Sequence, residues 1–162
     1  MPRPNLAIPI DYVTFRLDIL VSIAKEDASH VYERESGVSL RDLRVLRNVA
    51  HQPGMMQGLL VERCYIEKTS LSKRVSALAA RGLLTRESSA DDARQALLHL
   101  TPLGQETVAH CERTGRRLER AMLASLTGHE RAVFEDCIDK ITSRLLLQRE
   151  QAGMPKTTRL RR

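Results

Sequence analysis

Apolar residues recur every three to four positions along most of this chain, which is the spacing typical of helices that bury one face. The first such run extends from Ile10 to Glu35, about seven helical turns, and is followed by Ser36 and Gly37. Glycine suits the position just after a helix. We therefore predict one long amphipathic helix over residues 10–35, with these inward positions: Ile10, Val13, Leu17, Leu20, Val21, Ala24, Ala28 and Val31.

Three shorter helices are predicted next. Ser39 can cap the second helix, with Asp42 three residues on, and that helix stops before Gln52. The third is predicted over residues 55–65, and the fourth over about residues 69–81, ahead of a closing glycine. The positions expected to face inward are Leu43, Leu46, Ala50, Met56, Leu59, Leu60, Cys64, Leu71, Val75, Leu78 and Ala79.

The spacing changes between residues 83 and 101. Residues 83–87 have the character of a half-buried strand, residues 88–92 are turn-forming, and an alternation of period two runs from Ala96 to Thr101. This predicts a hairpin. Helical spacing returns at Pro102, in two long helices separated at Thr127-Gly128, whose inward positions are Val108, Cys111, Gly115, Leu118, Met122, Leu126, Phe134, Cys137, Ile138, Ile141 and Leu145.

The predicted fold class is therefore mainly α with a small β-hairpin. The first helix and the last two carry more apolar surface than a small central unit can cover. Apolar stripes of this size usually pack against a partner. The simplest interpretation is a homodimerisation region built from both ends of the chain, and the alternative is packing of the same helices within one subunit.

Charge is distributed unevenly along the chain. The sequence has 26 Lys and Arg residues and 20 Asp and Glu residues, a net charge of +6. Residues 39–101 hold ten basic and six acidic residues, residues 153–162 hold four basic and no acidic ones, and the first predicted helix is acidic. A basic central segment favours an anionic partner such as DNA, and the tail can add non-specific affinity.

The third and fourth helices, joined by a short turn over residues 66–68, fit a helix-turn-helix. The second helix of this motif reads the major groove of DNA with its N-terminal half. Hydroxyls can bond bases or phosphates, and cations can bond guanine or neutralise phosphate. The alternative is a basic face that is merely solvated. The candidate contacts are Thr69, near the cap, Ser70, Ser72, Lys73 and Arg74.

The predicted hairpin tip carries Arg94 two residues after Asp92. An arginine on a narrow hairpin can enter the minor groove, and a carboxylate can hold its guanidinium in place; an ordinary turn with a surface ion pair is the alternative. With the stretches "LRDLRVLRNVA", "TSLSKRVSALAARGLLTR" and "DDARQALLHLTPLG", residues 38–104 resemble the multiple-antibiotic-resistance regulator (MarR) family of winged helix-turn-helix repressors.

The resemblance implies a homodimer that grips a pseudo-palindromic operator and is released by a small, often aromatic and anionic, effector. It implies dimerisation helices over residues 10–38 and 102–150 and a DNA-binding lobe over residues 39–101. The composition of residues 151–162 predicts a basic disordered tail. The residues it places on DNA are Thr69, Ser70, Ser72, Lys73 and Arg74 in the major groove, Arg94 in the minor groove with Asp92 as its support, and Arg86 at the base of the wing near the backbone.

Two residues are candidates for holding the carboxylate or phenolate of such an effector. Arg16 on the first helix offers a forked donor for carboxylate, and His51 at the end of the second offers a donor with a pH-sensitive charge. The alternatives are a solvated Arg16 and a His51 that only caps its helix.

A redox-sensing regulator is a second hypothesis for the same family. The three cysteines are widely spaced, form no disulfide framework, and lie on predicted inward positions away from evident basic activation. We expect them to be buried thiols that act as small apolar side chains: Cys64, Cys111 and Cys137.

Other classes of protein fit less well. The chain has no glycine-rich phosphate loop and no His-Glu-x-x-His motif, and His110 and Cys111 point about 100° apart on a helix. We expect no enzyme, cofactor or metal; a helical dimeric adaptor without DNA binding is the remaining alternative. No run of about 18 apolar residues is present, and the first residues do not fit a signal peptide, so we expect a cytoplasmic protein.

Overall fold

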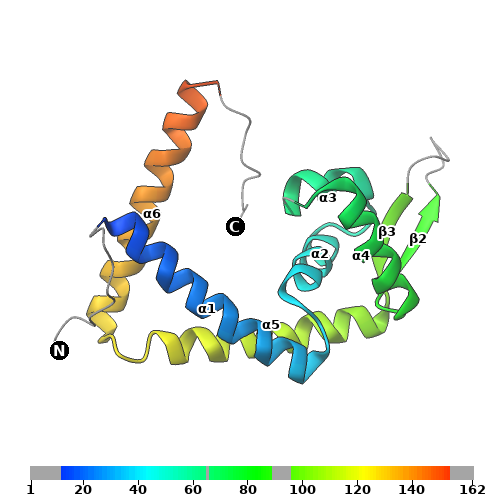
Figure 1. The fold of residues 1–162 in the computed structure, drawn as a ribbon, viewed down its shortest axis with the longest axis horizontal. Coiled ribbons are helices and arrows are strands. Elements are labelled where there is room, and N and C mark those ends of the chain that lie inside the picture. Colours follow the sequence, from blue (N-terminus) through cyan, green and yellow to red (C-terminus); the bar gives the residue numbers. More distant parts are fainter. Residues whose placement is uncertain (1–11, 65, 89–95, 154–162) are drawn as a thin grey trace.

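The computed structural model describes residues 12–64, 66–88 and 96–153. Within them, six helices and a small three-stranded antiparallel sheet confirm the predicted fold class (Figure 1). The elements in chain order are α1 (Val13–Ser36), α2 (Leu40–His51), β1 (Met55–Met56), α3 (Gln57–Cys64), α4 (Lys68–Ala80), β2 (Leu84–Ser88), β3 (Ala96–Leu100), α5 (Pro102–Met122) and α6 (Gly128–Gln151).

The molecule has two parts, which we call the lobe and the arm. The lobe comprises α2 to β3, and the arm comprises α1, α5 and α6. Figure 1 shows α5 running beneath the lobe and out of it, with α6 turning away steeply at its far end. None of the helices in the described part of the chain combines the length and the apolarity that a membrane crossing needs.

The ends of α1 and α2 follow the predicted capping chemistry, and α5 and α6 have caps that were not predicted. Gly37 closes α1 with φ of 63°, a left-handed conformation that glycine adopts at no steric cost. The Ser39 hydroxyl accepts a hydrogen bond from the Asp42 backbone N–H at 3.1 Å, which starts α2 as predicted. Thr101 starts α5, and Thr127 with Glu130 forms a capping box that starts α6.

The prediction of a helix over residues 55–65 is wrong at its beginning. Met55 and Met56 form β1, which pairs with Leu98 and Leu97 of β3 and makes the strand order β1-β3-β2. Gly54, with φ of 76°, turns the chain out of the helical path just before. Pairing with a strand more than 40 residues away outweighs the local helical pattern. At the other end of the predicted helix, Tyr65 lies outside the described residues.

Several predicted inward positions are also wrong. Met56 and Leu59 are exposed, because β1 and α3 present a different face to the lobe from the one a continuous helix would. Ala50, near the end of α2, is also exposed. Val45 and Val49 are fully buried instead, since α2 is covered on more than one side. Cys137, predicted to be buried, is exposed on α6.

One hydrophobic core fills the lobe and reaches the contact with the arm. Its members come from every element except α6. Full burial of an aliphatic side chain contributes roughly 1.5–3 kcal/mol each, so this cluster supplies most of the stabilisation of the described fold. The residues are Tyr32, Val38, Leu43, Val45, Leu46, Val49, Met55, Leu60, Cys64, Leu71, Val75, Leu78, Leu83, Leu84, Leu98 and Cys111.

Polar contacts join the arm to the lobe. The Glu35 carboxylate of α1 accepts hydrogen bonds from Arg117 at 2.6 Å and from Thr114 at 3.0 Å on α5. These bonds lower the pKa of Glu35 below its ordinary value. On the other side of α5, Glu112 pairs with Arg47 of α2 at 2.6 Å. Helix α5 is therefore tied to both α1 and α2.

The close fit of α5 under the sheet gives a first prediction. A Cβ on Gly104 would overlap the Leu83 carbonyl oxygen, which accepts a hydrogen bond from the Thr101 backbone N–H. Gly104→Ala therefore pushes the start of α5 away from the strand base. We expect a loss of about 1–3 kcal/mol in the free energy of unfolding, measured by urea denaturation followed by circular dichroism.

Gly58→Ala is the matched control. A Cβ on Gly58, near the start of α3, meets nothing within 4 Å. That variant should be as stable as the parent or slightly more so, because alanine favours helices. A Gly104→Ala protein with an unchanged urea midpoint would contradict the described packing.

Candidate nucleic-acid interface

Helix α4 presents a polar face to solvent because its apolar face is used up by the core. Leu71, Val75 and Leu78 are buried at a helical spacing of four and three. Thr69, Ser70 and Lys73 are exposed and Ser72 is half-buried, so the N-terminal half of the helix offers hydroxyls and a cation outward. This is the side-chain chemistry that can reach both base edges and phosphates.

Glu67 caps α4, a role that the sequence pattern did not indicate. Its carboxylate accepts hydrogen bonds from the backbone N–H groups of Thr69 at 2.9 Å and Ser70 at 3.0 Å. Thr69, predicted to lie near the cap, is the second residue of the helix. These backbone bonds, that of Thr69 foremost, lower the pKa of Glu67. The negative charge is thus committed to the helix end, where it also complements the helix dipole.

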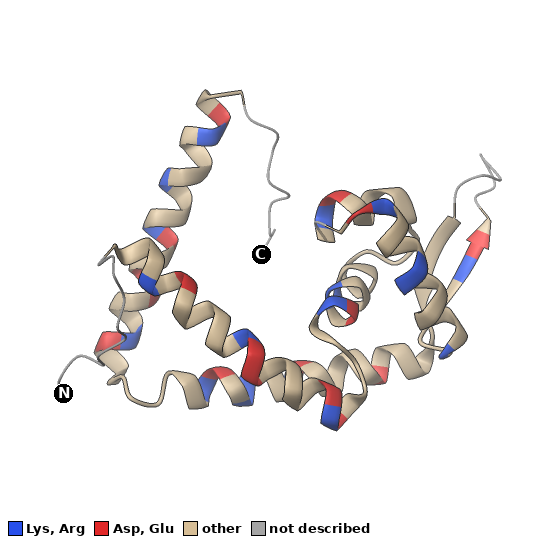
Figure 2. Ribbon diagram, viewed as in Figure 1, with Lys and Arg blue, Asp and Glu red and all other residues tan. Residues whose placement is uncertain are grey.

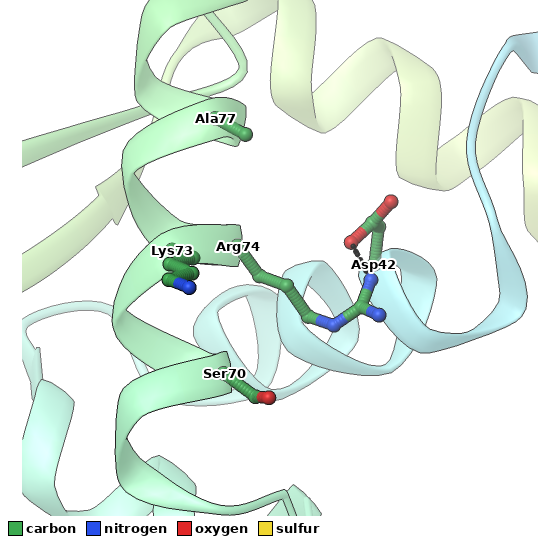
Figure 3. Close-up of a pocket in the computed structure, with 5 residues that line it drawn as sticks. All are labelled: Asp42, Ser70, Lys73, Arg74 and Ala77. Atoms are coloured by element: carbon green, nitrogen blue, oxygen red, sulfur yellow. Dashed lines mark hydrogen bonds and ion pairs between the residues drawn. The ribbon is translucent and has the colours of Figure 1, made fainter.

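Arg74 leans from α4 toward α2. Its guanidinium pairs with the Asp42 carboxylate at 2.8 Å, and the two side chains are 27% and 19% exposed (Figure 3). Asp42 in turn accepts a hydrogen bond from the Ser39 hydroxyl at 2.7 Å. The Asp42 carboxylate therefore bonds both to Ser39, at the capped start of α2, and to Arg74, on the exposed flank of α4.

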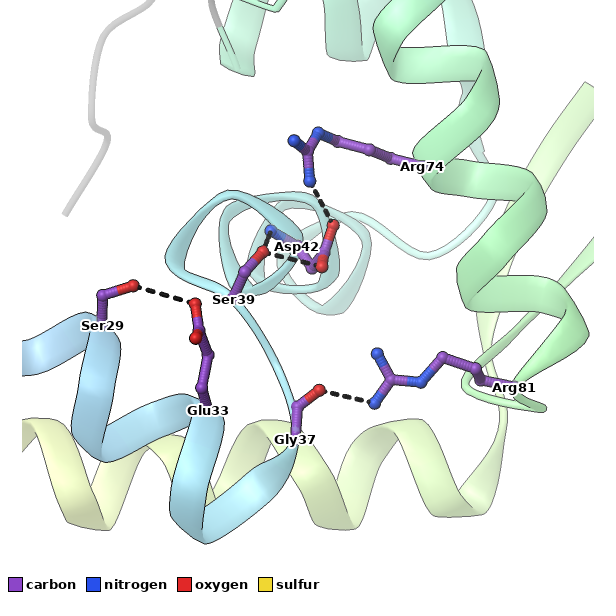
Figure 4. Close-up of polar contacts among 7 residues, drawn as sticks. All are labelled: Ser29, Glu33, Gly37, Ser39, Asp42, Arg74 and Arg81. Carbon is purple, nitrogen blue, oxygen red and sulfur yellow. Dashed lines mark hydrogen bonds and ion pairs between the residues drawn. The ribbon is translucent and has the colours of Figure 1, made fainter.

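A second arginine fixes the other end of α4. Arg81, just after the helix, donates to the Gly37 carbonyl oxygen at 2.9 Å (Figure 4). Gly37 lies in the turn between α1 and α2, so both arginines attach α4 to the region where α2 begins. The orientation of the candidate reading helix is set by these two polar contacts in addition to its buried face.

Arg86 of β2 reaches back to α4 instead of into open solvent. It donates to the Ser76 hydroxyl at 2.9 Å and to the Ser72 carbonyl oxygen at 3.4 Å. The hairpin base is thereby attached to the flank of α4 opposite to that of Asp42. Asp92 and Arg94, the predicted wing-tip pair, lie outside the described residues.

The two candidate effector ligands are not brought together within one chain. Arg16 is exposed in the first turn of α1, and His51 is exposed at the end of α2. Figure 1 shows the start of α1 at the end of the arm remote from the lobe that contains α2.

Two adjoining hollows lie between α2 and α4. The first, of about 350 Å³, is lined by Asp42, Ser70, Lys73, Arg74 and Ala77 (Figure 3). The second, of similar volume, shares Ser70 and Arg74 with it. Figure 2 shows that Lys and Arg residues of the lobe lie on α2, around α4 and on β2, on elements that surround this region. The described lobe therefore combines a shaped surface with positive charge.

Two of the three thiols are shielded in the hydrophobic core. Cys64 and Cys111 are fully buried, as predicted, and burial raises the pKa of the Cys64 thiol. A raised pKa keeps this sulfur protonated and unreactive at neutral pH.

Comparisons with known proteins agree with this geometry. Residues 36–95 match the family model described as MarR family. A Thauera aromatica protein ascribed the transcriptional regulation of the hcr operon is 32% identical over 90 residues, which is 56% of this chain and 54% of that protein. The transcriptional regulator HosA of Escherichia coli O127:H6 is 29% identical over 97 residues, 60% of this chain and 72% of HosA. The chain thus spans about half the length of the first relative.

Solved structures share the fold over most of the chain. The PcaV transcriptional regulator of Streptomyces coelicolor superposes with a TM-score of 0.69 at 25% identity, covering 83% of this chain and 97% of that one. A mutant of MarR from Escherichia coli superposes with a TM-score of 0.76 at 18% identity, covering 83% of this chain and 99% of that one. The arm and the lobe both take part in these superpositions.

The Glu67 cap gives a prediction about pH. Because its pKa is lowered by folding, its contribution to stability is present above the ordinary value of 4.5 and disappears as the pH falls through the lower folded value. Glu67→Gln should lower the urea midpoint at pH 7, and the difference from the parent should shrink progressively below pH 4.5. Glu62→Gln, at an exposed position on α3, is the control, with a smaller difference at pH 7. If the difference in urea midpoint between Glu67→Gln and the parent stays constant down to pH 3, the stabilisation by the cap does not depend on the negative charge of Glu67.

Proposed function

Because the chain belongs to the MarR family of winged helix-turn-helix transcription regulators, we propose that it is a ligand-responsive regulator, acting as a repressor, that binds a pseudo-palindromic operator as a homodimer. The family is one of DNA-binding regulators and not of enzymes. The observation that carries the proposal is the exposed N-terminal half of α4, capped by Glu67 and fixed on α2 by Arg74.

In the proposed complex, α4 enters the major groove. Exposed hydroxyls and Lys73 meet base edges and phosphates, while Arg86 approaches the backbone at the base of the wing. Arg74 reaches DNA from the flank on which it pairs with Asp42. Arg94 enters the minor groove with Asp92 as its support. The proposed contacts are Thr69, Ser70, Ser72, Lys73, Arg74, Arg86, Asp92 and Arg94.

We assign residues 10–38 and 102–150 to the dimer interface, residues 39–101 to the DNA-binding lobe and residues 151–162 to a basic tail. The uncovered apolar surface of the arm supports this assignment. Helix α6 has no buried residue in the single chain, and α1 and α6 together expose large apolar side chains at Val13, Phe15, Leu17, Leu20, Val21, Ile23, Val133, Ile138, Ile141, Leu145, Leu146 and Leu147. A second copy of the chain offers the same surfaces in return.

The effector in this proposal is a small aromatic anion held by Arg16 and His51. Since these residues lie far apart in one chain, a site that uses both takes them from different subunits of the homodimer. Effector binding is then sensitive to how the two lobes are placed, which couples it to the spacing of the two reading helices. The burial of Cys64 and Cys111 favours this mode of release over oxidation of either thiol, and leaves Cys137 as the exposed one. The named relatives are bacterial, so we place the action in the cytoplasm, with the DNA.

Binding to the DNA upstream of the chain's own gene tests the proposed function. A DNA reader shifts this fragment and loses affinity steeply between about 50 mM and about 200 mM salt, because counterions are released on binding. Arg94→Ala should weaken the complex about tenfold or more. Arg120→Ala, at an exposed position on α5 outside the apolar side chains proposed for dimerisation, should leave it unchanged. The absence of a shift at low salt would instead favour an adaptor without DNA binding.

The effector site is tested by titrating a set of aromatic acids into the preformed complex with DNA. The parent protein should be released by at least one of them. An Arg16→Ala, His51→Ala variant that still binds DNA should need a concentration at least tenfold higher, because neither anion-binding donor remains. Release of the variant at the same concentration as the parent would remove these residues from the site.

A further inference from the structure

Two arginines on α2 lie on the flank of the candidate reading helix and have no role in the function proposed above. Arg41 and Arg44 are three residues apart on α2, a spacing that places them on one helix face, and both are exposed. They line the second hollow between α2 and α4, of about 350 Å³, whose remaining lining residues are Ile66, Glu67, Ser70 and Arg74.

The charges around this hollow leave a positive excess. Glu67 is engaged by the backbone at the start of α4, and Asp42 is paired with Arg74. Arg44 donates to the Cys64 carbonyl oxygen at 3.1 Å, a neutral acceptor that orients the guanidinium without cancelling its charge. Among the described residues that line the hollow, three are arginines and one is acidic. The site therefore has the chemistry of an anion site with one pre-oriented arginine.

The hollow is continuous with the surface of α4 that we propose to enter DNA. Ser70 and Arg74 line it and also line the neighbouring hollow, where Lys73 lies (Figure 3). A strip of basic and hydroxyl groups thus runs from Lys73 of α4 across to Arg41 and Arg44 of α2. The contact between Arg74 and Asp42 lies within this strip and holds its two halves together.

The geometry of DNA indicates what such a strip meets. A helix in the major groove, which is about 12 Å wide, has a row of phosphates on each side. Arg86 is attached to one flank of α4 through Ser76, and the two arginines of α2 lie beyond the other flank. Phosphate oxygens match the forked guanidinium donors in shape and charge.

We propose that Arg41 and Arg44 bind backbone phosphates of duplex DNA along the α2 side of α4. This inference rests on the proposed function and deepens it, by adding a phosphate contact on a helix outside the reading helix and the wing. Such contacts fix the register of the protein on the duplex and are independent of base sequence. The contact between Arg74 and Asp42 acts as a positioning element, since it sets the distance between the base-reading and phosphate-binding groups.

The test measures affinity against salt concentration for the full chain on two duplexes, the upstream fragment and an unrelated sequence of equal length. Arg41→Gln and the Arg41→Gln, Arg44→Gln variant should weaken both complexes by the same factor. The slope of log affinity against log salt should become shallower by about 0.9 for each phosphate that the variant no longer neutralises, and by twice that in a homodimer. Arg41→Lys, Arg44→Lys should restore most of the slope.

Arg116→Gln is the matched control: it removes an exposed charge on α5, outside the apolar side chains of α1 and α6 that we propose for dimerisation, and should keep the parent slope. Arg41→Gln serves alone if the double variant fails to fold, because Arg44 also bonds to the backbone of α3. A variant with the parent slope would overturn the proposal, and so would a weakening confined to the upstream fragment, which would indicate a base contact. If the parent itself binds neither duplex, the proposed function fails and not only this inference.

Discussion

The burial of α2 is the constraint on which the rest of the structure depends. Four of its twelve residues are completely buried, and its neighbours include α1, α3, α4, α5 and β3. Its remaining side chains bond to three of these helices, through Asp42 to α4, Arg44 to α3 and Arg47 to α5. The buried face of α4 turns its hydroxyls and Lys73 outward, and these polar contacts hold the helix in place against α2 in addition.

The arm differs from the lobe in how many of its side chains one chain buries. The lobe completes its own core, whereas α6 buries nothing and α1 buries only Tyr32 among the described residues. Helix α5 belongs to both parts, because Cys111 lies in the core while Glu112, Thr114 and Arg117 bind α2 and α1. Helix α5 therefore joins the arm to the lobe through both apolar and polar side chains.

Much of this organisation could be predicted from the sequence, because it depends on short-range chemistry. The helical periodicity, the glycine after α1, the hydroxyl cap at Ser39 and the proline at the start of α5 act within one or two turns, and the structure confirms them. The alternation over residues 96–101 likewise predicted β3. The cap by Glu67 could have been predicted by the same reasoning, since it precedes the exposed hydroxyl residues by two positions. Thr69 offered an alternative cap, however.

The rest depends on contacts that no local pattern contains. Strand β1 is only two residues long and exists because β3, more than 40 residues later, supplies its partner. Arg74 was predicted as an outward contact because its helix position and charge allow that, whereas its partner Asp42 lies 32 residues earlier on another helix. Cys137 was placed inward by periodicity, yet its helix has no core to face in one chain. Periodicity identifies the apolar face of a helix but does not say which molecule covers it.

The mass of the complex with DNA shows whether one chain builds a complete reading lobe but only half of an interface. The stretch of upstream DNA that the protein protects from nuclease would be made as a short duplex and its complex weighed by native mass spectrometry. We expect two chains on one duplex, and two chains in the protein without DNA. A complex with a single chain, or a single chain free in solution, would contradict it.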